Sequence, residues 1–356
     1  MNTLNSGCSI KKQLQPIIAA IFLLLILFFT QSCHAHRYYS HDDWIPIDTD
    51  LQNIREVRNM LSIGKALYIS AVNKAGISKV WKIDINTSNS IAEAVDTGLK
   101  TKDFAYYLSV GAGSILYAFI GTEVYKLDIT SNAAKWISIK DGLENGYVQL
   151  LYSDDKTLWA STSSGKLFEK DVANDNPWKE FSTAGLPKGK TFALQPIDNN
   201  LYLSRRYANQ INIYYKNLND GPSNWELFGS FNSVINHLGT SNQSLYVSMY
   251  TDLRKIEIAV PNETTPTSSY KNPLQYEVIA LHSTDGVMYA LTDTSEIYFD
   301  DGSSADWKKL SDSILDPDSN DSSFDGIVDF TITDNTMYVI TKLGKILKLD
   351  LAPNKK

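Results

Sequence analysis

The chain has 356 residues, of which 43% are hydrophobic and 21% charged, so it carries enough apolar side chains to build a core and is not expected to be disordered. Its 33 Lys and Arg residues against 40 Asp and Glu residues give a formal net charge of −7, which argues against a nucleic-acid-binding protein. Two cysteines, Cys8 and Cys33, cannot form a disulfide framework or a zinc cluster.

The first segment of the chain is an apolar run from Ile17 to Phe29 that follows two lysines. Because a helix needs about 20 apolar residues to cross a bilayer, we interpret residues 1–32 as a signal peptide. The end of this segment resembles a bacterial lipobox, although Thr30 stands where Leu is usual. We therefore expect lipid on Cys33 and an extracytoplasmic location at a membrane of the bacterial cell envelope. A soluble secreted form and an uncleaved membrane anchor are the alternatives.

The next region repeats one pattern seven times, a Leu or Met followed by Tyr or Trp, at steps of 49, 42, 43, 44, 43 and 49 residues. Each pair lies in an apolar strand preceded by a polar turn, and a third strand that often ends in an acidic or amide residue follows. A short strand led by Trp comes next in most units. Four short strands per unit are typical of a β-propeller blade. The seven pairs are Leu67-Tyr68, Leu116-Tyr117, Leu158-Trp159, Leu201-Tyr202, Leu245-Tyr246, Met288-Tyr289 and Met337-Tyr338.

One Trp-led strand, residues 44–47, precedes the first complete unit, whereas the last unit ends at Leu351 without such a strand. Trp44 stands 23 residues before Leu67, in register with the other Trp-led strands. We therefore predict an all-β, seven-bladed β-propeller of four-stranded antiparallel blades, with residues 44–47 closing the ring beside the last blade. The predicted boundaries are a linker over 33–43, the propeller over 44–352 and a tail over 353–356.

Tryptophan marks the fourth strand of most units, and we expect these side chains to be buried between neighbouring blades. The first and fifth units lack this Trp, so Ala94-Val95 and the segment near Tyr270 are weaker candidates for their fourth strands. The five tryptophans are Trp44, Trp136, Trp178, Trp225 and Trp307.

The stretch from Asp141 to Gly165, with Gly142-Leu143, Asp154 and Leu158-Trp159 within it, resembles the repeat of two-component-regulator propellers. Gly185-Leu186-Pro187 is a second, shorter likeness, while Ser161 replaces a usual Gly. In that family the propellers form the extracytoplasmic sensory part of a receptor. The resemblance therefore implies a propeller fold outside the cytoplasm.

Side chains suited to catalysis are sparse in the predicted ring. His237 and His282 lie on predicted innermost strands, where they either line the channel or serve as structural histidines. Glu56 and Asp329 are the acidic exceptions on these otherwise apolar strands. We expect no catalytic residue and no cofactor, although a propeller hydrolase or lyase with its active site at the tunnel mouth is an alternative.

Two clusters of residues with metal-binding side chains stand out in the sequence. The first is His34, His36 and His41 with Asp42 and Asp43, whose spacing fits no established site. The second, the acidic stretch Asp316 to Asp325, departs from the EF-hand spacing, so we expect a solvated loop and no metal. A periplasmic small-molecule or metal sensor is the remaining alternative for the function.

Binding of a protein or glycan on a loop face is the function we expect, in a monomeric, non-enzymatic scaffold. Loops that join the outer strand to the next inner strand, and the second strand to the third, gather on one face of a propeller. Paired arginines and exposed tyrosines there have the composition of interface anchors. The predicted partner-binding residues are Arg205, Arg206, Tyr207, Tyr250, Asp252, Tyr106 and Tyr107.

Overall fold

The computed structural model describes residues 39–351 except for 41–42, 52, 87–90, 101–105, 112, 132–133, 144–145, 155, 208–209, 222, 251, 259–273, 275, 305, 312–313 and 315–325. The predicted signal peptide, Cys33 as the predicted lipidation site, the three histidines considered as metal ligands, the acidic loop and the segment near Tyr270 lie outside the described residues. Within the part that is described, no helix has the length and apolar composition needed to cross a membrane.

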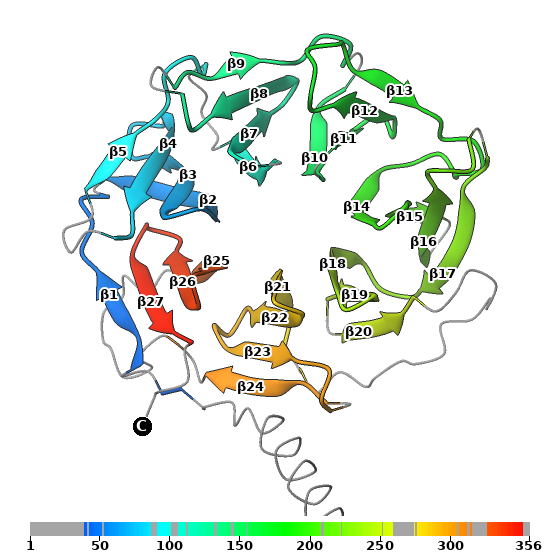
Figure 1. Cartoon of the computed structure of the whole chain (residues 1–356). Helices are drawn as coiled ribbons and strands as arrows, with labels where there is room; N and C mark the ends of the chain where they lie inside the picture. The colour runs from blue at the N-terminus through cyan, green and yellow to red at the C-terminus, as the bar shows by residue number, and fades with distance from the viewer. Residues whose placement is uncertain are drawn as a thin grey trace, which may run out of the picture. The chain divides into compact units, whose positions relative to one another are not determined.

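Seven antiparallel sheets are arranged as blades around a central axis, as predicted (Figure 1). Six sheets have four strands, and the fifth shows three within the described residues. From the centre outward the blades are β2 (Ile54–Ile63), β3 (Ala66–Asn73), β4 (Ser78–Asp84), β5 (Ala92–Ala94); β6 (Tyr107–Val110), β7 (Ile115–Ile120), β8 (Glu123–Asp128), β9 (Ile137–Ser138); β10 (Val148–Ser153), β11 (Thr157–Thr162), β12 (Leu167–Asp171), β13 (Lys179–Phe181); β14 (Thr191–Ile197), β15 (Asn200–Tyr207), β16 (Gln210–Asn217), β17 (Glu226–Phe231); β18 (Ile235–Ser241), β19 (Ser244–Met249), β20 (Asp252–Glu257); β21 (Val278–Thr284), β22 (Val287–Thr292), β23 (Ile297–Asp300), β24 (Lys308–Ser311); and β25 (Ile327–Thr333), β26 (Thr336–Thr341), β27 (Ile346–Asp350), β1 (Ile45–Ile47).

The ring closes between the two ends of the propeller, because β1 pairs antiparallel with β27 in the seventh blade (Figure 1). Pro46 lies opposite Leu347 in this outermost strand, where its missing N–H group leaves no ladder bond unmade. The strand preceding the first blade therefore completes the last one, as the spacing of Trp44 predicted. The described chain begins slightly earlier, at Tyr39, which forms a parallel bridge with Ser311 of blade six.

The predicted tryptophans are all buried, each directly before an outermost strand. The indole N–H of Trp178 donates to the carbonyl oxygen of Ile139 at 2.6 Å, and that of Trp225 donates to the carbonyl oxygen of Ser182 at 2.8 Å. Trp136 bonds the segment after β5 in the same way. These three tryptophans thus tie their blades to the end of the preceding blade, and Trp307 packs edge-on against Tyr246 of the preceding blade. Their role as interblade packing residues is confirmed.

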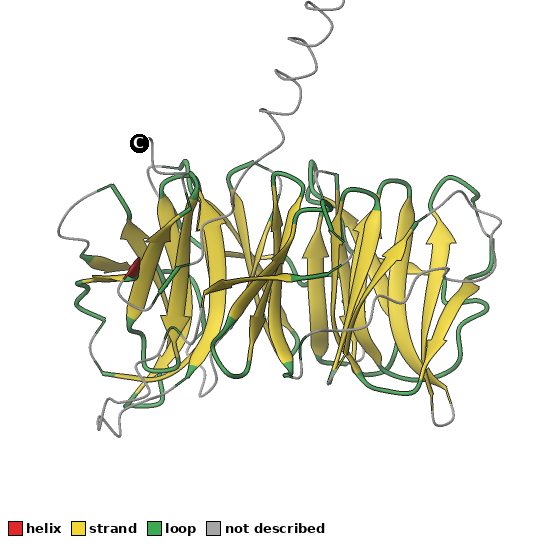
Figure 2. Cartoon of the chain, turned by 90° about the horizontal axis from the view of Figure 1, so that it is seen from below, coloured by secondary structure: helices red, strands yellow, loops and turns green. Residues whose placement is uncertain are grey.

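The blade edges define two faces, which Figure 2 shows from the side. Each innermost strand begins at the end of the blade where the hairpin between the second and third strands lies, since neighbouring strands run antiparallel. The hairpin between the first and second strands lies at the other end. Loops that are far apart in the sequence are thereby collected on one face of the ring.

Candidate partner-binding face

Exposed apolar side chains are concentrated on one face. Among the described residues, thirteen large hydrophobic side chains are exposed. Eight of them lie in hairpins between second and third strands or at the entry to innermost strands, and therefore on the same face. We call this surface the tyrosine face; its residues are Ile77, Tyr107, Tyr147, Tyr207, Val234, Tyr250, Tyr276 and Leu343. All seven blades contribute to it, so one face of the ring carries more exposed apolar side chains than the other, which marks it as a candidate interaction surface.

The remaining exposed hydrophobic side chains are dispersed. Four lie along the outer strands or just before them, and Val110 lies on the opposite face. Single exposed apolar side chains are normal on any protein surface and need no functional explanation. The four outer residues are Ile45, Ile91, Ile137 and Leu227.

Five tyrosines of the tyrosine face come from five consecutive blades, the second to the sixth. Tyr107 stacks on Phe119 with ring centroids 5.1 Å apart, and the guanidinium carbon of Arg58 lies 4.8 Å from the centre of the Tyr107 ring. The backbone N–H of Tyr147 donates to the hydroxyl of Ser163 at 3.0 Å, which fixes that residue beside the neighbouring hairpin. Tyrosine offers a large apolar surface with a polar tip at a small entropic cost, which suits it to binding surfaces.

The structure divides the predicted partner-binding residues into exposed and buried ones. Tyr207 and Tyr250 are each 61% exposed, and Arg206 is exposed as well. Asp252 is partly exposed and accepts a hydrogen bond from Nε of Arg254 at 2.7 Å. These residues and Tyr107 are accessible to a partner, and their binding role stays a prediction.

Arg205 and Tyr106 do not lie on the surface, contrary to expectation. Arg205 is only 2% exposed, because its side chain turns inward from the strand on the side opposite to that of Arg206. Tyr106 is fully buried, and its hydroxyl donates to the carbonyl oxygen of Lys100 at 2.6 Å. Burial raises the pKa of the Tyr106 phenol. Both side chains are structural and are removed from the candidate site.

Sequence reasoning missed Tyr147 and Tyr276. Each stands just before an innermost strand, at a position related to that of Tyr107. The signal was present, because three blades carry Tyr at this entry point. In the sequence alone, nothing distinguishes an exposed Tyr at this point from a buried one such as Tyr106.

The central tunnel is lined by the innermost strands, including β18, β21 and β25 (Figure 1). Burial lowers the pKa of His237 to about 4 and also lowers that of His282. Burial raises the pKa of Asp329 to about 7, although its carboxylate accepts hydrogen bonds from the backbone N–H groups of Met60 and Phe330, each at 2.9 Å. His282 contacts the ring of Phe330 edge-on. These three groups lie on different blades. Desolvation shifts all three pKa values, because burial disfavours the charged form and so lowers the pKa of an imidazole and raises that of a carboxylic acid.

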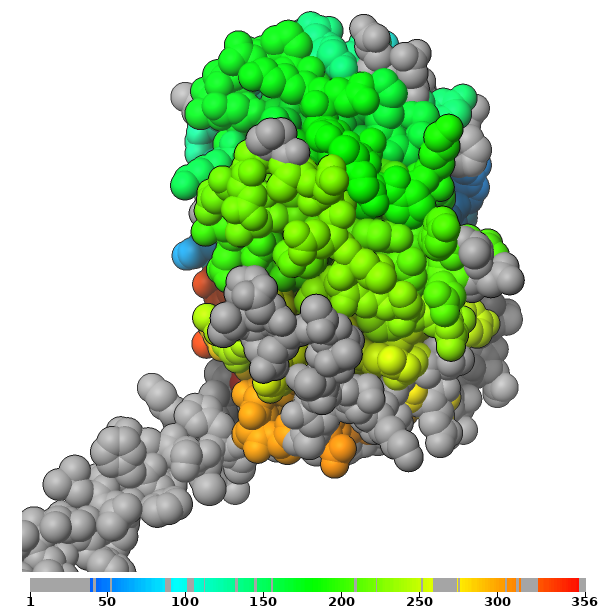
Figure 3. Space-filling model, turned by 90° about the vertical axis from the view of Figure 1, so that its right-hand side faces the viewer, coloured from blue at the N-terminus to red at the C-terminus, as the bar shows by residue number. Residues whose placement is uncertain are grey.

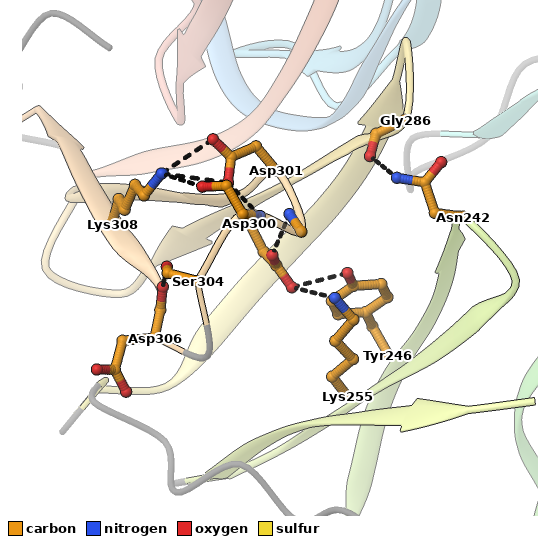
Figure 4. Close-up of polar contacts among 11 residues, drawn as sticks. Asn242, Tyr246, Lys255, Gly286, Asp300, Asp301, Ser304, Asp306 and Lys308 are labelled. Carbon is orange, nitrogen blue, oxygen red and sulfur yellow. Dashed lines mark hydrogen bonds and ion pairs between the residues drawn. The ribbon is translucent and has the colours of Figure 1, made fainter. Parts of the chain in front are cut away.

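A second polar cluster joins blades five and six on the opposite face (Figure 4). Oδ2 of Asp300 accepts hydrogen bonds from the hydroxyl of Tyr246 at 2.8 Å and from Nζ of Lys255 at 3.0 Å. Asp301 pairs with Lys308 at 2.9 Å, and this cation together with bonds from Ser303 lowers the pKa of Asp301. A cavity of about 410 Å³ lies beside the cluster. The charged groups of the cluster are paired with one another, so the arrangement ties two blades together.

A second cavity, of about 470 Å³, lies at the outer edge of blade three and is lined in part by Lys170 and Glu169. Burial lowers the pKa of Lys170, a property of catalytic lysines. Its ammonium donates to the carbonyl oxygen of Asn176, however, and Lys216 of the next blade bonds Ser223 in the same way. A contact repeated at equivalent positions of two blades indicates a structural role. No group of three or more potential metal ligands is found among the described residues.

Comparison with protein-family models finds no match, and comparison with curated proteins finds none. Solved structures are similar in fold. A structure of YCF48 bound to D1 peptide is 12% identical with a TM-score of 0.62, and the match covers 88% of this chain and 99% of that one. The WD40 β-propeller domain of Doa1 is 9% identical with a TM-score of 0.58, covering 85% of this chain and 94% of that one.

The extracellular domain of a putative one-component system, BT4673 from B. thetaiotaomicron, is also similar, at 13% identity and a TM-score of 0.57. The match covers 86% of this chain but 39% of the BT4673 chain, so the present chain spans well under half of that protein. At such low identities the similarities establish the propeller fold alone.

Proposed function

We propose that this chain is a membrane-anchored, extracytoplasmic lipoprotein whose propeller is a non-enzymatic scaffold that binds a protein or glycan through the tyrosine face. The observation that supports the binding role is that, among the described residues, eight of the thirteen exposed large hydrophobic side chains lie on one face. Burying them in an interface removes apolar area from water, which favours association. One similar propeller structure contains a bound D1 peptide, which is consistent with a protein partner.

Removing two tyrosines of this face tests the binding role. We expect Tyr147→Ser with Tyr207→Ser to weaken partner capture, because exposed tyrosines that become buried in an interface often contribute about 1–2 kcal/mol each. The measurement is crosslinking pull-down from native membranes, quantified for the partners that the unmodified chain retains. The melting temperature should stay unchanged, because both side chains are exposed in the free protein.

The matched control is Ile137→Ser with Leu227→Ser, which removes two equally exposed apolar side chains from outer strands. Equal capture by both double variants would count against the tyrosine face. Arg205→Ala is unsuitable for this purpose, because it removes a buried side chain and so changes the stability of the propeller.

The anchor requires a separate experiment. If Cys33 carries lipid, cells fed with labelled palmitate should label the chain, and Cys33→Ala should abolish both the label and sedimentation with membranes. Undiminished label in the Cys33→Ala variant would remove the lipoprotein part of the proposal and leave the binding face unaffected.

A further inference from the structure

Backbone segments that carry four cationic side chains meet on the tyrosine face where blade three adjoins blade four. Figure 3 shows the outer rim of the ring, with the residues of these two blades in green and yellow-green. The backbone brings them together: a β-carbon on Gly165 would overlap the carbonyl oxygen of Gly189, and one on Gly189 would lie 3.5 Å from the carbonyl oxygen of Arg206. The hairpin of blade three, the segment entering blade four and the end of β15 therefore touch. We call their side chains the basic patch: Lys166, Lys188, Lys190 and Arg206.

The buried Arg205 holds these three segments in place. Its guanidinium donates to the carbonyl oxygen of Pro187 at 2.9 Å, to the hydroxyl of Thr191 at 3.3 Å and to the carbonyl oxygen of Gly165. No carboxylate among the described residues pairs with it, and burial lowers its pKa. An uncompensated positive charge thus lies directly beneath the basic patch. Such a charge favours an anion at the surface above it.

The surface cations of the basic patch are largely free of acidic partners. Lys166 pairs with Glu180 at 2.6 Å, but within the described part of the chain Lys188 and Arg206 make no ion pair. Nζ of Lys190 lies 5.7 Å from the ring centre of Phe192, a contact with no counter-charge. Three cations of the patch are therefore available to a ligand, in a chain whose net charge is −7.

The neighbours of the basic patch are aromatic. Tyr207 follows Arg206 directly and is 61% exposed. Tyr147 is bonded through its backbone N–H to Ser163, in the hairpin that carries Lys166. The patch therefore offers hydrogen-bond donors without acceptors, flanked by two apolar rings. Carboxylates need donors only, whereas a neutral sugar hydroxyl is both donor and acceptor.

We propose that the basic patch binds a peptide segment carrying Asp or Glu side chains, whose apolar residues pack on Tyr147 and Tyr207. This inference rests on the proposed function and specifies the chemistry of the partner. Because the chain has a net charge of −7, its overall field disfavours the approach of an acidic peptide, whereas the local positive charge of the patch attracts it. Electrostatic repulsion and attraction together select one docking site on the ring.

The test measures the affinity of the full chain in detergent for a fluorescein-labelled peptide, Glu-Leu-Glu-Glu-Leu-Glu, by fluorescence anisotropy at low salt. We expect Lys188→Glu with Lys190→Glu to weaken binding about tenfold, since two exposed charge contacts are together equivalent to about 1–1.5 kcal/mol. Lys74→Glu with Lys342→Glu is the control, because it reverses two exposed charges on the same face in blades one and seven. That variant should bind within about twofold of the unmodified chain.

Three results would overturn the inference. Absence of binding by the unmodified chain is the first, and equal loss in both double variants is the second, since it would indicate general charge attraction. The third is a preference that does not require Asp or Glu side chains. It would be seen as equal affinity for the uncharged Gln-Leu-Gln-Gln-Leu-Gln peptide, or as binding of polygalacturonate, an acidic glycan, at the patch without binding of the acidic peptide. In the third case the tyrosine face still binds a partner, so the proposed function survives while the acidic peptide is rejected.

Discussion

Neighbouring residues of similar chemistry have opposite roles in this propeller, because successive side chains of a strand point to opposite sides. Arg205 is buried, and its guanidinium donates hydrogen bonds to the segment entering blade four and to the hairpin of blade three. Arg206 is exposed. Tyr106 and Tyr107 divide in the same way. In both pairs, the second residue contributes an exposed side chain to the candidate binding surface, and the first packs inside the blade.

Asp329 is a titratable residue that links two blades of the ring. Its carboxylate accepts the N–H of Met60, so it links the seventh blade to the first on the inner side, as β1 does on the outer side. Asn59 bonds Leu108 in the second blade from the equivalent position of β2. The uncharged side-chain amide of Asn59 therefore accepts the same kind of backbone hydrogen bond between blades that the carboxyl group of Asp329 accepts.

Stability should depend on pH through Asp329. Since its pKa is about 7 when folded and near 4 when unfolded, the folded state binds the extra proton between these values, and stability is lost as pH rises towards 7 and above. We expect Asp329→Asn to match the unmodified chain near pH 4 and to be more stable at pH 8, by roughly 2–4 kcal/mol. Urea denaturation across this pH range measures the difference.

The comparison between variant and unmodified chain is essential, because His237 acts in the opposite direction. Its pKa is lowered to about 4, so it favours folding as pH rises from there to about 6.5. Asp334→Asn, in an exposed hairpin, changes the net charge by the same amount and serves as the control. A stability difference that does not grow with pH would contradict the assignment.

At the scale of elements, turn residues determine where the strands of each blade end. The hairpins at Asn242-Gln243, Asp285-Gly286 and Asp334-Asn335 have positive φ at both central residues, as two-residue turns between twisted strands require. Third strands end in an Asp or Asn whose side chain accepts the N–H two residues later, which stops the strand. This explains the acidic or amide endings seen in the sequence, and the residues are Asp84, Asp128, Asp171, Asn217 and Asp300.

The closing strand should be the element most sensitive to a single substitution. Trp44 is buried, and its indole N–H donates to the hydroxyl of Ser311 at 3.1 Å. We expect Trp44→Ala to lower the free energy of unfolding by about 3–5 kcal/mol and Trp44→Phe, which loses the hydrogen bond and little volume, by about 1–2 kcal/mol. Guanidinium denaturation measures both.

Ile45→Ala supplies the control for this element, since Ile45 follows Trp44 as the first residue of β1 and has an exposed side chain. Its stability should change by less than about 0.5 kcal/mol. Equal destabilisation by Trp44→Ala and Ile45→Ala would mean that β1 does not fasten the ring.

At the scale of the whole molecule, the two faces differ in chemistry. Among the described residues, the hairpins between first and second strands, on the face opposite the tyrosines, carry four aspartates against two lysines, whereas the basic patch lies on the tyrosine face. An acidic partner would therefore be turned towards the tyrosine face before contact. The aspartates are Asp154, Asp198, Asp285 and Asp334, and the lysines are Lys65 and Lys156.

The sequence by itself determined the blade, because each of its signals is local. A turn residue, an alternating strand and a leading Trp lie within one repeat, and their spacing predicted seven blades and the closing strand that β1 provides. The tertiary structure decided which side chains reach solvent. Arg205 is buried because segments of blades three and four meet around it. Tyr147 and Tyr276 share one surface because the ring places the same ends of blades three and six on one face. Exposure is a property of the assembled ring, and no single repeat contains it.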